Sequence, residues 1–524
     1  MKPLSLTKNV LFIFVLAFAA RLAYTFFLSQ NYFFYNHPGS DVLYYRDWAM
    51  EIASGDWLGG RVFFGMPLYP YILSVLLRIS LANIEVVRIF HLLIGSLNCV
   101  LVYQIARKMF TENIGILAGL FCAFSFTLIY YDWLMMPVPF IILFSLLIVY
   151  LHITQNKNFT QRQWFVWGLL LGLSCLLDGK FLIFIGIYLL WNLTKKRIKQ
   201  NIPVVIGVLC VLLCVGLRNY LVGKSWVWIT AQTGLSFYVG NGPNANGLYQ
   251  HPNFLRPDHH GQDADQIIEA QRRSGKNLTA KEVSHYWRAQ ALQHIQENPN
   301  QYPQLLGEKI TKFFTEIEEA YDVDLLLQKQ WKSILDWNPY WLVWPFAVFG
   351  MFITRKKEGS TVINIVILSQ LIFTLIFFLN HRHRATLMPF LIMYEVVFFA
   401  WLLDKIKSKK FIPVAGTLLG ALACVFIFPY QNIDAKTYQF LYHTKTAPIH
   451  DQNKNFLEAE KSYRIALQLE PTDTNVWYNL ANSQYQRGNL EAAIQTNRHV
   501  LTLNPQHIDA LFNLGFIYKE RAQW

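Results

Sequence analysis

The sequence predicts an all-α membrane protein: a polytopic bundle of spanning helices, followed by a short solenoid of helical repeats. Three observations predict this fold class. Hydrophobic residues make up 53% of the 524 residues and charged residues only 15%, whereas soluble domains carry about 25% charged residues. The hydrophobic residues gather in long runs, which is typical of membrane helices. The C-terminal tail, by contrast, is polar and repeats with a fixed period.

The apolar runs predict about 11–13 membrane spans, all helical, because backbone amides in lipid need partners within their own segment. The first run lacks a small-residue cleavage site, so we interpret it as an uncleaved span. The stretch 67–82 is apolar but carries Arg78, which favours an interfacial or re-entrant helix, with a further span as the alternative. The other runs lie at 10–29, 84–106, 113–131, 136–154, 164–177, 181–194, 203–220, 340–354, 361–379, 386–403 and 411–429.

Lys and Arg residues predict which side of the membrane each loop faces. Alternate short loops hold most of them, whereas the opposite short loops hold only Lys180, Arg382 and Arg384. The positive-inside rule then places the N-terminus in the cytoplasm. The long loops 30–83 and 221–339, and the tail after residue 430, are predicted to face the extracytoplasmic side.

Composition and motifs exclude several other classes of protein. The net charge of +13 is explained by these loop clusters, so nucleic acid is not predicted as a partner. All six cysteines fall inside apolar runs, where they read as small core residues without disulfides. No Gly-rich phosphate loop follows a strand, so a nucleotide-sugar site is not supported.

The tail repeats every 34 residues. Glu470-Pro471 recurs as Asn504-Pro505, and Asn479-Leu480-Ala481 recurs as Asn513-Leu514-Gly515. This pattern resembles the tetratricopeptide repeat over 453–524, after a linker at 431–452 and a membrane domain at 1–430. The resemblance implies protein or peptide binding, and a structural lid over the outer loops is the alternative. Small residues that would let paired helices approach closely stand at Ala459, Ala466, Ala481 and Ala493.

Charged residues concentrate at the outer ends of the spans. Asp41 lies in the first outer loop, and Lys180, Arg382 and Arg384 follow later spans. In a folded bundle these ends converge on one face, and carboxylates facing cations suit a substrate with an anionic head and a lipid tail. A transporter would instead place its polar groups at the bilayer midplane of two related halves.

Five motifs along 1–404 carry a family resemblance. They are Ser40-Asp41-Val42-Leu43-Tyr44-Tyr45, Met66-Pro67-Leu68-Tyr69-Pro70-Tyr71, Arg88, the stretch 233–249, and His381-Arg382-His383-Arg384 followed by Pro389. Together they resemble the bacterial polyprenyl-phosphate-sugar glycosyltransferases of the GT-C superfamily, which are related to protein O-mannosyltransferases and to the aminoarabinose transferase of lipid A. The sequence departs from the family at Val42, where many members have a second acid, at 135–139, which lacks a Glu, and at 178–180, which lacks an Arg-Pro.

The resemblance implies a membrane glycosyltransferase that moves a hexosyl or pentosyl group, with inversion, from a polyprenyl-phosphate donor to an acceptor outside the bacterial inner membrane. Asp41 would be the general base, the alternative being a helix cap. Arg384, Arg382 and Lys180 would bind the donor phosphate, the alternative being contact with lipid headgroups. The substrate pocket would be lined by Tyr44, Tyr45, Tyr69, Asp132, Tyr238 and Asn241.

Cofactors and partners follow from the same resemblance. A divalent metal ion stays open as a cofactor, with Asp132, His381 and His383 as candidate ligands. The predicted partners are the lipid bilayer, the polyprenyl-phosphate-linked sugar, and a protein or peptide acceptor held by the repeats. The alternative function is a catalytically inactive membrane scaffold that recruits partners through its repeats, since the second acid is missing at Val42.

Overall fold

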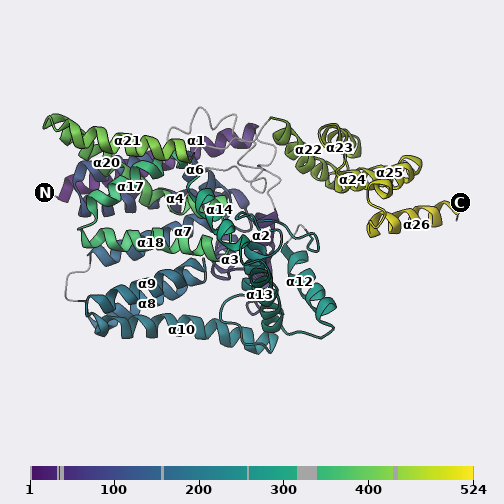
Figure 1. Ribbon diagram of the computed structural model, residues 1–524, viewed down its shortest axis with the longest axis horizontal. Helices are drawn as coiled ribbons and strands as arrows, with labels where there is room; N and C mark the ends of the chain where they lie inside the picture. Colours follow the sequence, from purple (N-terminus) through teal and green to yellow (C-terminus); the bar gives the residue numbers. More distant parts are fainter. Residues whose placement is uncertain are drawn as a thin grey trace. The chain divides into compact units, whose positions relative to one another are not determined.

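The computed structural model describes residues 3–31, 35, 40–154, 159–256, 259–315, 339–428 and 435–522. The chain divides into two compact units, one of residues 1–317 with 334–430 and one of 318–333 with 431–524. In the described ranges the regular secondary structure is helical, apart from an isolated bridge between Leu248 and Leu379 (Figure 1). The predicted all-α fold class is therefore confirmed.

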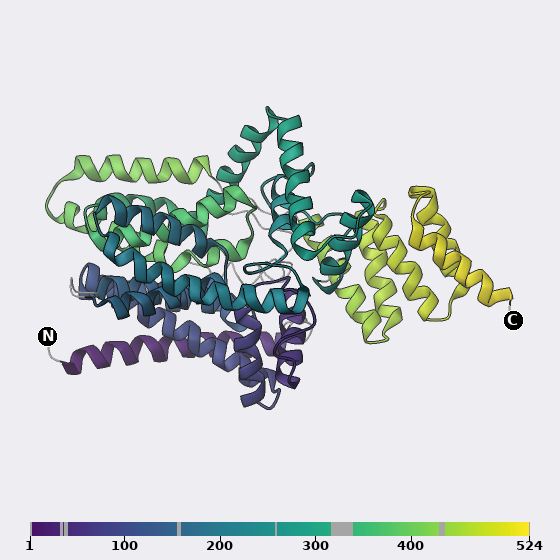
Figure 2. The same cartoon turned by 90° about the horizontal axis from the view of Figure 1, so that it is seen from below.

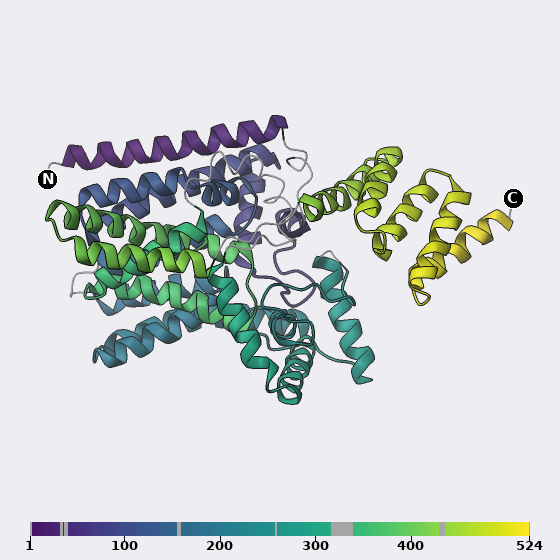
Figure 3. The same cartoon turned by 45° about the horizontal axis from the view of Figure 1, so that its top comes forward.

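The first unit is a bundle in which each predicted apolar run coincides with one helix or, for the run 113–131, with two. Four of these helices are long and apolar enough to cross a membrane, within Lys8–Gln30, Ile84–Met109, Ile198–Gly223 and Gly359–Ile376. Shorter apolar helices lie beside them, and Figures 1, 2 and 3 show the axes running roughly side by side. The bundle helices are α1 (Pro3–Asn31), α4 (Ile84–Met109), α5 (Glu112–Ala123), α6 (Phe126–Trp133), α7 (Val138–Thr154), α8 (Gln161–Cys175), α9 (Lys180–Thr194), α10 (Ile198–Gly223), α17 (Tyr340–Thr354), α18 (Glu358–Ile376), α20 (Met388–Lys407) and α21 (Phe411–Ile427).

One predicted span is not a continuous helix. The run 113–131 is divided into α5 and α6, whose axes differ by 55°. Ser125 has an extended ψ of 118° and precedes α6 as its N-cap residue, a position at which Ser is favoured. The predicted run 113–131 is thus helical on both sides of a bend, which its continuous apolar composition does not mark.

The remaining helices of the first unit, called the outer helices below, gather at one end of the bundle (Figures 1 and 3). Among them, α3 has 12 residues, which at about 1.5 Å per residue is too short for a hydrocarbon core of about 30 Å. Arg78 near its end donates to Ala53 O at 2.6 and 2.9 Å. The interfacial interpretation of 67–82 therefore fits better than a further span. The outer helices are α2 (Ser40–Ser54), α3 (Leu68–Ile79), α11 (Thr233–Asn241), α12 (His259–Ser274), α13 (Ala280–Glu297), α14 (Gln301–Phe314) and the short α19 (His381–Ala385).

The second unit is a solenoid of antiparallel helices with its own core. The predicted small residues, such as Ala466 and Ala481, are fully buried where helices meet. The segment 431–452, expected to be a linker, contains helix α22, whose Ala447 joins the core around Tyr463. Pro448 lies inside this helix, and a proline there argues against a helix at the sequence level. The helices are α22 (Ala435–Gln452), α23 (Phe456–Leu469), α24 (Thr474–Gln486), α25 (Leu490–Leu503) and α26 (Ile508–Ala522).

Candidate functional site

The first and last motifs meet at an ion pair. Arg382 Nη1 donates to Asp41 Oδ2 at 2.6 Å, across 341 residues of sequence. Asp41 is the second residue of α2, so it lies within the first turn, where the helix dipole favours a negative charge. The side chains are 28% and 30% exposed, so both charges are accessible from outside the protein.

The other two predicted cations lie deeper. Lys180 is buried, with its Nζ 2.6 Å from Thr386 Oγ1 and 3.2 Å from Asp178 Oδ2. Arg384 is also buried and donates to Lys312 O at 2.9 Å. Both side chains are therefore used to hold the segment around α19. Arg382 is the cation of this group that reaches solvent.

His383 lies among these charges. Burial lowers its pKa to about 3; Asp178 opposes this shift, and the neighbouring cations reinforce it. At neutral pH the imidazole is uncharged, so it adds no positive charge to the cationic group.

Tyr45 lies beside the Asp41–Arg382 pair, and the predicted Tyr44 and Tyr69 pack against Tyr45. The rings of Tyr45 and Tyr69 meet edge to face with centroids 5.2 Å apart, and those of Tyr44 and Tyr45 are 5.4 Å apart. Burial raises the pKa of Tyr45 to about 12, against the opposing charge of Arg382. Its hydroxyl therefore stays protonated and can donate a hydrogen bond. The predicted carboxylate, cation and tyrosines are thus brought together.

Asp132 lies elsewhere, inside the bundle. It accepts a 2.7 Å hydrogen bond from Arg21 Nε, and the two side chains are 3% and 1% exposed. It lines no accessible face, so the structure does not place it with the other predicted pocket residues. Arg21 was missed in the sequence, although an arginine inside an apolar span is a rare feature that usually signals a buried partner.

Asn241 and Tyr238 lie on α11, in a second cluster. Asn241 Nδ2 donates to Ile376 O at 2.8 Å, and Lys309 Nζ donates to Asn241 Oδ1 and to Leu375 O, both at 2.9 Å. Tyr238 instead packs against Trp287, with centroids 5.0 Å apart. The side chain of Asn241 is thus a structural tie between α11, α14 and the end of α18.

Two glycines of the same motif let α11 approach neighbouring backbone segments closely. A Cβ at Gly240 would collide with Phe377 O, and one at Gly234 would collide with Ser284 O. Leu379 N also donates to Gly247 O at 2.9 Å. The motif at 233–249 therefore holds the segment that leads directly into α19 and Arg382.

Lys309 was not foreseen in the sequence. It is completely buried, and burial lowers its pKa from 10.5 to about 7. The signal that could have found it is its spacing from Leu306 and Phe313, which puts all three on one face of α14.

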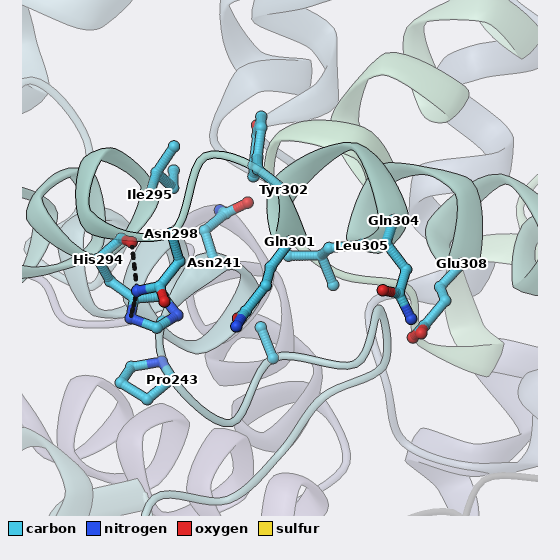
Figure 4. A pocket seen from close by; sticks show the side chains of 12 residues that line it. Asn241, Pro243, His294, Ile295, Asn298, Gln301, Tyr302, Gln304, Leu305 and Glu308 are labelled. Carbon is cyan, nitrogen blue, oxygen red and sulfur yellow. Dashed lines mark hydrogen bonds between the residues drawn. The ribbon is translucent and has the colours of Figure 1, made fainter.

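A pocket of about 320 Å³ opens beside Asn241, between α13 and α14 (Figure 4). Its polar lining comes mainly from amide side chains. Among the residues that the structure describes, no group of three or more His, Cys, Asp or Glu side chains could hold a metal ion.

The fold and these clusters define a multipass α-helical membrane protein that carries a helical-repeat unit. Residues 65–217 match the family model described as dolichyl-phosphate-mannose-protein mannosyltransferase, and residues 452–511 match a tetratricopeptide-repeat model. The chain is thus similar to that mannosyltransferase family over 65–217 and to tetratricopeptide repeats over 452–511, as the sequence resemblance implied. The first match includes Lys180 but neither Asp41 nor Arg382.

The chain is also similar to named proteins. It is 38% identical over 72 residues to Protein O-mannosyl-transferase TMTC1 of Mus musculus, a match that covers 14% of this chain and 8% of that protein. An oligosaccharyltransferase of Archaeoglobus fulgidus in its apo form aligns with a TM-score of 0.40 at 13% identity, over 87% of this chain and 60% of that one. The same organism's AglB, in complex with an inhibitory peptide and a dolichol-phosphate, aligns with a TM-score of 0.40 at 12% identity, over 86% and 59%.

Proposed function

We propose that the protein is a glycosyltransferase that moves a sugar from a lipid-phosphate donor to an acceptor at the outer end of its helix bundle. The observation that carries this proposal is the partly exposed Asp41–Arg382 pair beside Tyr45, against which Tyr44 and Tyr69 pack. The matched family is described by a donor of this class, dolichyl phosphate mannose. A bacterial inner membrane with outward-facing repeats is the setting that fits the loop charges.

Asp41 acts as the general base in this proposal. An acceptor hydroxyl attacks the anomeric carbon, its proton passes to the Asp41 carboxylate, and the bond from that carbon to the phosphate oxygen breaks with inversion. The electron pair of that bond leaves with the lipid phosphate, which gains negative charge. A carboxylate placed in this way contributes about 10²–10⁴-fold to the rate.

Arg382 is the group that receives this charge. A guanidinium can grip two phosphate oxygens, and Arg382 is accessible at 30% exposure. While it is paired with Asp41 it weakens that carboxylate as a base, because a neighbouring cation favours the ionised form. A bound donor phosphate competes with Asp41 for Arg382 and weakens that pairing. Lys180 and Arg384 hold the segment around α19, which carries Arg382, through their bonds to Thr386 and Lys312 O.

The repeat unit is assigned a separate role, which is to hold a polypeptide acceptor or partner. Its support is the repeat match at 452–511. Tyr45 is assigned to the sugar of the donor because it lies next to the Asp41–Arg382 pair, with Tyr44 and Tyr69 packed against its ring.

The test is transfer from a polyprenyl-phosphate sugar by the full chain in proteoliposomes, followed as release of polyprenyl phosphate. Asp41→Asn should lower the rate by about 10²–10⁴-fold. The matched control is Asp47→Asn on the same helix, whose partner is the neighbouring Arg46 at 2.8 Å, and it should transfer at the normal rate. Full activity of Asp41→Asn would reject the assigned base. A wild-type chain that releases no lipid phosphate would reject the transferase and favour the scaffold.

A further inference from the structure

The pocket beside Asn241 has a firm base. Three hydrogen bonds fix the Asn241 side chain: Nδ2 donates to Phe237 O at 2.9 Å and to Ile376 O at 2.8 Å, and Oδ1 accepts from Lys309. The next residue, Gly242, lies so close to Tyr238 O that a Cβ there would approach it to 2.7 Å. This wall of the pocket is therefore formed before any ligand arrives, which lowers the cost of binding.

The opposite wall presents amide groups. In Figure 4, Gln301 and Gln304 extend from α14 toward the loop that carries Pro243, and His294 and Asn298 lie to one side of Gln301. Asn298 is held by His294 O at 3.0 Å. The side-chain amides of Gln301 and Gln304 make no hydrogen bond to another residue in the described part of the chain. Each amide can therefore offer a donor pair and an acceptor to a ligand.

The charge of the pocket selects the class of ligand. No Lys or Arg is among its lining residues, and the single carboxylate, Glu308, lies 3.7 Å from Lys312. A phosphate or other anion would lack a partner in such a pocket. Ile295, Leu305 and Tyr302 add apolar surface. Amides beside an apolar patch suit a neutral ligand that has many hydroxyls and a C–H face.

We propose that this pocket binds a saccharide unit, with Gln301 and Gln304 hydrogen-bonded to its hydroxyls. A volume of about 320 Å³ lies at the small end of ligand pockets, which run from about 300 to 1,000 Å³, so it suits one compact unit better than an extended chain. The proposal adds a second sugar site to the proposed transferase and rests on it for its biological role. The saccharide comes either from the lipid-linked donor or from a glycan already on the acceptor.

Binding can be measured without any transfer. The probe is a panel of free hexoses, N-acetylhexosamines and their disaccharides, titrated into the full chain in nanodiscs and followed by saturation-transfer difference NMR. The double variant Gln301→Ala/Gln304→Ala should bind at least about tenfold more weakly, since each hydrogen bond to a ligand contributes severalfold in affinity. The matched control is Gln293→Ala on α13, whose exposed amide bonds only Glu297 at 2.8 Å.

Two results would overturn the proposal: no saccharide in the panel gives a signal, or the double variant binds as well as the control. Transfer kinetics then distinguish the sources. If the double variant has a higher KM than the wild type for the lipid-linked donor, the bound saccharide is the donor sugar. If its KM is higher for a glycan-bearing acceptor, the bound saccharide belongs to the acceptor. Each result supports the site.

The same design separates this inference from the proposed function. Asp41→Asn should retain the part of the saccharide signal that the double variant loses. If the wild-type chain shows no transfer but its saccharide signal is lost in the double variant, the transferase fails and the saccharide site stands.

Discussion

At the scale of single residues, the charge of Arg382 matters less than the shape of its head group. Arg382→Lys keeps the positive charge and still reaches toward Asp41, but an ammonium cannot hold two phosphate oxygens in one plane. We expect kcat/KM for the lipid-phosphate donor to fall by roughly tenfold or more, as a charge-assisted hydrogen bond is worth about 1.5–3 kcal/mol. Steady-state kinetics with varied donor would measure this.

The control for this change is Arg46→Lys, on the neighbouring surface of α2, where Arg46 pairs with Asp47. It should leave donor kinetics as they are. Equal activity of the Arg382→Lys and Arg46→Lys chains would show that Arg382 does not grip the phosphate.

The buried Lys309 predicts that the stability of the folded protein depends on pH. Its neutral amine has two N–H groups, enough for Asn241 Oδ1 and Leu375 O, whereas a third proton would find no carboxylate partner among the described residues. Burial lowers its pKa from 10.5 to about 7. Between these values the unfolded chain binds a proton that the folded chain does not, so this residue makes stability rise with pH from about 7 to 10.

Lys309→Met should remove that slope. From pH 6.5 to 9, the thermal midpoint of the wild type should therefore rise relative to that of the variant. Lys281→Met, at an exposed position of α13, should run parallel to the wild type. Parallel curves for Lys309→Met would mean that the Lys309 amine is charged in the folded protein.

The sequence could locate the charged residues of the site but not their partners. Asp41, Arg382 and the tyrosines stand in motifs, so their grouping at one end of the bundle could be predicted. The pairing of Asp41 with Arg382 depends on packing across 341 residues, which no local pattern contains. Asp132 was assigned to the pocket because Arg21 was not recognised as its partner, and that partner lies 111 residues away.

At the scale of elements, α11 is built to press against its neighbours. Gly240→Ala would place a methyl group against Phe377 O, and such overpacking costs about 1–3 kcal/mol. The displaced segment carries Arg382, so transfer should fall together with stability. Gly307→Ala on α14 is the control, because a Cβ there meets nothing within 4 Å and alanine favours a helix. Thermal unfolding and lipid-phosphate release would test both, and a fully stable, active Gly240→Ala chain would contradict the close approach.

Helices were easier to predict than their interruptions. Each apolar run became a helix because lipid leaves the backbone no other partner. The bend at Ser125 escaped prediction because Phe124 and Ser125 leave the helical conformation without changing the hydropathy. Helix α22 escaped because its stability comes from contacts of Ala447 with Ala459 and Tyr463, which are tertiary, whereas its local sequence contains Pro448.

At the scale of the whole molecule, two compact units with separate cores predict two separable unfolding events. Ala481→Leu enlarges a fully buried side chain in the repeat unit, which should cost about 1–3 kcal/mol. For a unit of this size each kcal/mol lowers the midpoint by about 4–8 °C. Scanning calorimetry should show one transition moving down while the other holds, and lipid-phosphate release should continue at the normal rate. Gln486→Leu, at an exposed position of the same helix, should move neither transition. A single transition that shifts as a whole would show instead that the bundle and the repeats unfold as one cooperative unit. Release of lipid phosphate would then have to be remeasured below the new midpoint before sugar transfer and partner binding could be assigned to separate units.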